Sequence, residues 1–237
     1  MKIALVSVHG GTHTNALAKA LATTHHVTIY TRKENSEYPA RENISDQLEL
    51  VRLPVGPARQ LAESDVLELI PAFGAALAEA WAVDPPDVTH SLSWLAGLAA
   101  LVGRENRAIP IVHTCHGLVA SWLRHAHPNG YGQGRGPNET AVDPAVAERI
   151  RLERAIAHDV DHLIVTNRAD VGELRAMGVR ASKATVIPDG VDLEHFRLKG
   201  EPASDSSNPW PITKSAVTWP KSVRSRAAQP SYSASVR

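Results

Sequence analysis

The chain has 237 residues, 43% of them hydrophobic and 21% charged, which is enough for one or two globular domains with a sizeable core. Its 25 basic and 25 acidic residues cancel, which excludes the basic footprint of a nucleic-acid-binding protein and the polybasic patch of a membrane-surface protein. The single cysteine, Cys115, excludes an intrachain disulfide framework and fits a reducing compartment. No apolar run approaches the ~18 residues of a membrane span, so we expect a cytoplasmic protein without integral membrane contact.

The first half of the chain alternates apolar runs with helical spacing. Apolar runs predict buried strands at residues 2–8, 26–32, 48–53 and 88–92. Helical spacing predicts helices at residues 15–23, 65–81 and 95–102. Pro71 predicts a kink or a break in the second of these helices. The polar segment 33–46 is expected to be a loop.

The second half continues the same alternation. Strands are expected at residues 109–114, 162–166 and 184–188, and helices at residues 144–157 and 168–177. Between them, residues 128–137 hold four Gly and two Pro, which predicts a flexible loop that is either a lid or an insertion.

The repeated order of strand and helix predicts an α/β fold, namely a single Rossmann-like, doubly wound parallel sheet with helices on both faces. Ligands of such sheets bind at the carboxyl ends of the strands. The loops after Val8, Leu92 and Thr114 are therefore the first places to look for a site.

Composition changes near residue 200 and predicts a domain boundary. The last 37 residues hold nine Ser and five Pro, with few aliphatic residues at any regular spacing. Such a segment cannot bury enough apolar surface to offset its ordering entropy. We therefore expect a folded domain over residues 1–198 and a disordered tail over residues 199–237. One hypothesis is that a shifted reading frame gave rise to this tail.

Several segments together carry a resemblance to a known family. They are the Gly10-Gly11 turn, residues 87–101 (DVTHSLSWLAGLAAL), residues 110–118 (PIVHTCHGL), residues 148–174 (ERIRLERAIAHDVDHLIVTNRADVGEL) and residues 186–196 (VIPDGVDLEHF). In order and spacing they resemble the N-terminal, acceptor-side half of a family 4 retaining glycosyltransferase with the two-domain GT-B fold. Sucrose-phosphate-synthase-like and inositol-phosphate glycosyltransferases are the relevant groups. The resemblance covers residues 1–198.

The donor side of the expected site begins with Gly10 and Gly11. Glycines between a buried strand and a helix let backbone N–H groups approach an anion, and the resemblance assigns that anion as the donor diphosphate. The alternative is a tight strand-to-helix turn without a ligand.

His116 is the expected catalytic residue, because the family places a histidine beside the donor sugar after the strand that corresponds to residues 109–114. A structural role for His116 is the alternative. His113, Cys115 and His116 have no second ligand cluster at matching spacing, so no metal site is predicted.

The acceptor side is expected to use His90, Trp94, Arg124 and Arg149. Trp94 fits a core position equally well, and Arg149 also fits an exposed ion pair with Glu153 one helical turn away. This chain departs from the inositol-phosphate enzymes at two positions. Ser93 stands where they carry Tyr, and Gly117 where they carry Thr. Both changes remove hydroxyl groups that face the acceptor phosphate, which argues against an inositol-phosphate acceptor, although Arg124 could partly substitute.

The resemblance implies transfer of a hexosyl group from a nucleotide sugar, such as UDP- or GDP-hexose, to a small hydroxylated acceptor, with no other cofactor. In the family a C-terminal domain holds most of the donor, and no such domain is recognisable here. We therefore expect a truncated form that is weak or inactive alone, paired with a separately encoded C-terminal domain or self-associated through its exposed cleft face. Two alternatives remain: a stand-alone sugar- or phosphosugar-binding module, and a generic nucleotide-binding α/β protein.

Overall fold

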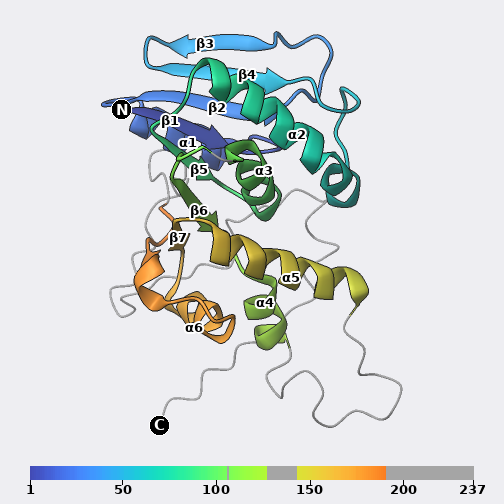
Figure 1. Ribbon diagram of the computed structural model, residues 1–237, viewed down its shortest axis with the longest axis vertical. Helices are drawn as coiled ribbons and strands as arrows, with labels where there is room; N and C mark the ends of the chain where they lie inside the picture. The colour runs from blue at the N-terminus through green and yellow to red at the C-terminus, as the bar shows by residue number, and fades with distance from the viewer. Residues whose placement is uncertain (106, 127–142, 191–237) are drawn as a thin grey trace, which may run out of the picture. The chain divides into compact units, whose positions relative to one another are not determined.

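The computed structural model describes residues 1–105, 107–126 and 143–190, and Figure 1 shows their arrangement. The first compact unit runs from Met1 to Asp189, and the description below concerns this unit. Three expectations lie outside the described residues: the glycine-rich loop at residues 128–137, the segment 191–198 and the tail over residues 199–237.

The core of the unit is an eight-stranded sheet with the strand order β3-β4-β2-β1-β5-β6-β7-β8. The strands are β1 Lys2–Val6, β2 His26–Arg32, β3 Arg41–Ser45, β4 Leu48–Leu53, β5 Val88–Ser91, β6 Ile111–Cys115, β7 His162–Val165 and β8 Ala184–Val186. Every neighbouring pair is parallel except β3 with β4, which is antiparallel. The predicted parallel α/β sheet is confirmed, and its carboxyl ends lie along one edge.

Strand β3 corrects the prediction of a loop over residues 33–46. All five of its residues are exposed, and its pairing with β4 is irregular between Asn43 and Ser45. A strand at the sheet edge with both faces in water needs no alternation of apolar and polar residues. The segment therefore gave no strand pattern to detect in the sequence.

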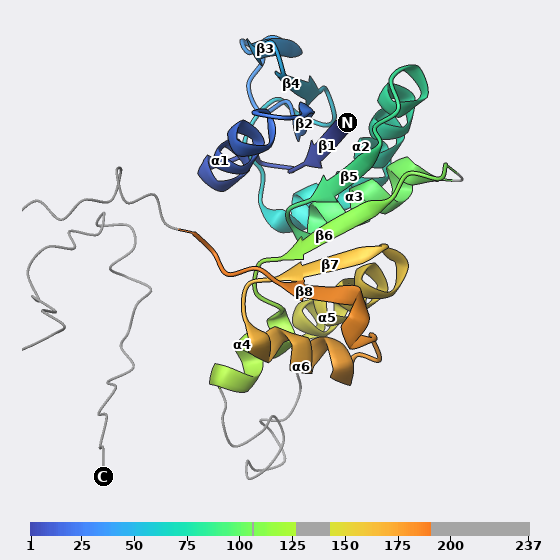
Figure 2. The same cartoon turned by 90° about the vertical axis from the view of Figure 1, so that its left-hand side faces the viewer.

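Helices cover both faces of the sheet. They are α1 Thr12–Leu21, α2 Glu63–Val83, α3 Trp94–Arg104, α4 Val119–Ala126, α5 Pro144–Asp159 and α6 Arg168–Ala176. Figure 2 shows α1 on the opposite side of the sheet from α2 and α3. The side chains of β1 alternate accordingly. Ile3 and Leu5 pack in the cluster that contains Ala18 of α1, whereas Ala4 and Val6 belong to the larger cluster that includes α2, α3, α5 and α6.

Helix α2 corrects two expectations. It continues through Pro71 as one helix of 21 residues, so of the kink or break predicted there, the break does not occur. It is also long and apolar enough to cross a membrane by length and composition, contrary to the reading of the sequence. However, Phe73, Leu77 and Trp81 are almost fully buried against the core, and α2 packs extensively on α3. This burial is typical of the core helix of a globular domain.

Candidate functional site

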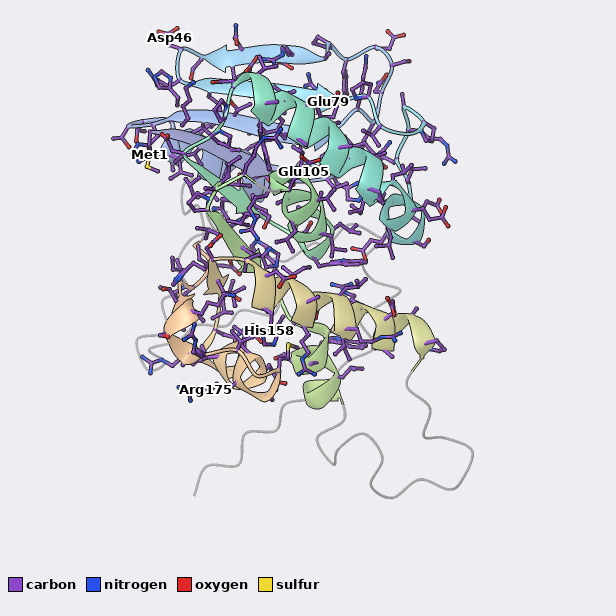
Figure 3. The ribbon with its side chains drawn as sticks, viewed as in Figure 1. Met1, Asp46, Glu79, Glu105, His158 and Arg175 are labelled. Carbon is purple, nitrogen blue, oxygen red and sulfur yellow. The ribbon has the colours of Figure 1, made fainter. Side chains whose placement is uncertain are left out.

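Two adjacent cavities lie at the carboxyl edge of the sheet. This edge is opposite to the end of β1 marked by Met1 in Figure 3. A third cavity, of about 300 Å³, lies at the amino edge and is lined by residues that include Lys2, His26 and Asp84. Because ligands of parallel sheets bind at the carboxyl ends of the strands, we place the candidate site in the two cavities at that edge.

The first cavity, called here the Gly11 cavity, has a volume of about 410 Å³ and opens in front of the turn after β1. Gly10 has a φ of 65° and Gly11 a φ of 132°, backbone conformations that residues with a side chain rarely adopt. Thr14 links the start of α1 to the segment after β1 by donating a hydrogen bond of 3.1 Å to Ser7 Oγ. No side chain caps the first turn of α1, and a Cβ placed on Gly11 would meet no atom within 4 Å. The Gly10 N–H donates to the Ser7 carbonyl at 3.3 Å, whereas no side chain caps the first turn of α1, so the amino end of this helix is where an anion could accept hydrogen bonds.

The second cavity, called here the Trp94 cavity, has a volume of about 180 Å³. It is lined by Glu63 at the start of α2, by Ser93 and Trp94 at the start of α3, by residues 113–118, and by Arg149 and Glu153 of α5. Helices from three parts of the chain thus converge on the loop after β6.

His116 lines both cavities. It follows β6 directly, and its ring lies edge-on to the ring of His13 with 4.8 Å between centroids and an interplanar angle of 84°. Partial burial and then the charge of a protonated His13 lower the pKa of His116, and Asp189 opposes this shift. The imidazole is therefore neutral at physiological pH and can both donate and accept a hydrogen bond.

His13 is a site residue that the sequence reading missed. It lies in the first turn of α1 and lines the Gly11 cavity together with His116. The available signal was its position two residues after a Gly-Gly turn, which puts it at the amino end of a helix facing the carboxyl edge.

Arg149 lines the Trp94 cavity and also forms the ion pair with Glu153 that the spacing predicts. Its guanidinium lies over the Trp94 ring, 5.2 Å from the centroid, and both residues line the Trp94 cavity. The same group forms an ion pair with Glu153, with Nε 3.1 Å from Oε1, and a second with Glu63, with Nη1 3.3 Å from Oε2. Glu153 also accepts a hydrogen bond of 3.0 Å from the Val119 N–H, and its burial raises its pKa. Glu63 is a second residue that the sequence reading missed.

Two predicted acceptor residues do not line either cavity as far as the structure describes them. His90 lies in β5, where its Nε2 is 2.7 Å from Thr114 Oγ1, so its ring forms part of the layer beneath His116. Arg124 lies in α4, and its side chain is outside the described part of the chain.

Gly117 and Ser93, the positions where departures from the inositol-phosphate enzymes are expected, each have a local role in the structure. Gly117 has a φ of 74°, a conformation that strains a β-branched residue such as Thr. Ser93 caps α3, because its Oγ accepts a hydrogen bond of 3.2 Å from the Ala96 N–H.

Within residues 1–105, 107–126 and 143–190, no group of three His, Cys, Asp or Glu side chains is arranged to hold a metal ion.

A parallel sheet with a site at its carboxyl edge defines a Rossmann-like α/β domain, and its architecture is that of the N-terminal half of the GT-B fold. A solved structure of sucrose-phosphate synthase from Thermosynechococcus elongatus is 25% identical with a TM-score of 0.64, and the match covers 82% of this chain and 92% of that chain. In a longer solved chain of that enzyme the match covers 49% of the length. Residues 10–190 match the model of the Glycosyl transferase 4-like domain, and the chain belongs to this family.

Other relatives fit the same assignment. A D-inositol 3-phosphate glycosyltransferase from Kribbella flavida is 28% identical over 177 residues, which is 72% of this chain and 38% of that protein. The chain therefore spans well under half the length of this relative. The fold is also similar to that of Anabaena HepE, solved in complex with UDP-glucose, with a TM-score of 0.50 at 14% identity over 82% of this chain and 45% of that chain.

Proposed function

We propose that this chain forms the acceptor side of a cytoplasmic, retaining glycosyltransferase. The reaction moves a hexosyl group from a nucleotide sugar, such as a UDP- or GDP-hexose, to a hydroxyl group of a small acceptor. The observation that carries the proposal is the position of His116, which lines two adjacent cavities at the carboxyl edge. A single imidazole in contact with both cavities can touch a donor sugar and an acceptor at the same time.

Each cavity suits one of the two substrates. The Gly11 cavity offers backbone N–H groups and the amino end of α1 to a diphosphate. The Trp94 cavity offers an aromatic ring, carboxylates and a guanidinium to the hydroxyl groups of an acceptor. In transfer, the bond between the anomeric carbon and the diphosphate oxygen breaks, and the electron pair leaves with the nucleotide. The acceptor oxygen then bonds to the same carbon, and its proton passes to the diphosphate oxygen that has left.

His116 supplies hydrogen bonds at the reacting centre in this proposal. A neutral imidazole can donate to a sugar hydroxyl or stabilise charge that develops near the anomeric carbon. In the family the donor is held largely by a second domain. The proposal includes contact between the carboxyl edge of the sheet and such a domain, whether separately encoded or otherwise supplied. The alternative is self-association of the chain through the same edge.

Replacing His116 by alanine is expected to weaken nucleotide-sugar binding about tenfold, because the ligand loses a hydrogen bond in a partly buried site. The test is a titration of the 237-residue chain with UDP-glucose and GDP-glucose, followed by nuclear magnetic resonance. Trp94→Ala is the matched control, since Trp94 does not line the Gly11 cavity. Equal affinity of wild type and His116→Ala would instead support a generic nucleotide-binding protein that uses the Gly10-Gly11 turn alone.

A further inference from the structure

The charges that line the Trp94 cavity are unbalanced. Arg149 is the one Lys or Arg among its described lining residues, and two carboxylates, those of Glu63 and Glu153, lie within ion-pair distance of it. Its guanidinium also lies over the Trp94 ring, so it already contacts one aromatic ring and two carboxylates. An anionic ligand would have to compete with both carboxylates for this cation.

The other titratable groups of the cavity do not add positive charge near neutral pH. Burial lowers the pKa of His113 to about 3 and also lowers that of His116. Burial raises the pKa of the Cys115 thiol to about 12. The described lining is therefore slightly negative, because only Arg149 offsets the two carboxylates.

The cavity also contains groups suited to hydroxyl ligands. Ser93 and Thr114 line the cavity, and their hydroxyl groups can exchange hydrogen bonds with a hydroxyl group of a bound molecule. The Glu63 side chain is 58% exposed, so its carboxylate can accept hydrogen bonds from a ligand that enters the cavity.

We infer that the Trp94 cavity selects an uncharged, polyhydroxylated acceptor and discriminates against the phosphorylated form of the same molecule. This inference rests on the proposed function and adds the chemical class of the acceptor. A neutral polyol can donate hydroxyl protons to Glu63 and accept from the Ser93 hydroxyl without disturbing Arg149. A phosphate would be placed beside two carboxylates and would have to displace at least one of them. The chain thus differs from the Kribbella flavida relative, whose name specifies an inositol phosphate.

The test compares two pairs of ligands on the 237-residue chain: glucose with glucose 6-phosphate, and myo-inositol with inositol 3-phosphate. We expect at least one unphosphorylated member to bind about tenfold more tightly than its phosphorylated partner at pH 7. Glu63→Gln should strengthen binding of the phosphorylated partner about tenfold, because it removes one of the two competing charges. Glu68→Gln is the matched control, since it removes an exposed carboxylate of the same helix that does not line the cavity. Urea unfolding of both variants checks that they fold.

The outcomes separate this inference from the proposed function. If neither pair shows tighter binding of the unphosphorylated member by the wild type, or if the preference is unchanged in Glu63→Gln, the inference is overturned while nucleotide-sugar binding through His116 still supports the function. Failure of all four ligands to saturate would also overturn the inference. If nucleotide sugars fail as well, the proposed function fails with it.

Discussion

The domain is expected to lose stability steeply as the pH falls from about 6.5 towards 4, because one buried and one partly buried histidine, His113 and His90, are neutral in the folded state. Burial, reinforced by neighbouring histidines, lowers the pKa of His90 to about 4 and that of His113 to about 3. His113 is 3% exposed, its Nδ1 lies 2.8 Å from Ser91 Oγ, and α3 packs closely over it at Gly97. Its ring therefore has little access to water when it takes up a proton.

The sign of the pH effect on stability follows from the histidine pKa values in the folded and unfolded states. Both pKa values are lower in the folded state than the ordinary value of about 6.5, so below that pH the unfolded chain binds more protons than the folded one. Near pH 5 the difference approaches two protons, and the free energy of unfolding should fall by about 2.7 kcal/mol per pH unit from these two residues.

Urea unfolding between pH 7.5 and 5 measures this slope. His113→Asn should reduce it by about half, whereas His26→Gln, which removes an exposed imidazole from β2, should leave it unchanged. An identical slope in His113→Asn and in the wild type would show that the buried histidines do not govern the acid sensitivity.

Replacing Trp81 by alanine is expected to lower the free energy of unfolding by about 3–5 kcal/mol, since it removes a large side chain from a close-packed core. Trp81 is 1% exposed and lies edge-on to Tyr30, with 6.2 Å between ring centroids. A Cβ placed on Gly103 would lie 3.0 Å from the Trp81 ring, so α2 and α3 already approach as closely as their side chains allow.

The matched control for this change is Trp122→Ala. Trp122 is 66% exposed on α4, and its replacement should alter stability by less than about 0.5 kcal/mol. Urea unfolding of both variants at pH 7.5 compares them directly. A loss below about 1 kcal/mol in Trp81→Ala would mean that the contact between α2 and α3 is much looser than the structure indicates.

How far the fold could be predicted depended on burial. The bounds of β2 and β4 were predicted as they are, because each strand carries several buried apolar residues close together in the sequence. Strand β3 was missed since an exposed edge strand leaves no such run. Pro71 was read as a possible break, but the packing of α2 against the core maintains the helix through that residue.

In the candidate site, only the residues that follow the carboxyl ends of strands could be predicted from the sequence. Gly10, Gly11 and His116 follow β1 and β6, so their meeting at one edge follows from the parallel sheet. The ion pair between Glu63 and Arg149 joins residues 86 positions apart on two helices, a contact that no local spacing reveals. That pair nevertheless decides the charge of the Trp94 cavity, and with it the class of acceptor inferred for the chain.

The most direct test of the account is an experiment that detects intermolecular nuclear Overhauser effects from the ring protons of His116 in the presence of both a nucleotide sugar and a polyol. The account predicts contacts from this one ring to the anomeric proton of the sugar and to carbon-bound protons of the polyol in the same sample. Contacts that instead arise from His26 and Lys2 at the amino edge, with none from His116, would contradict it.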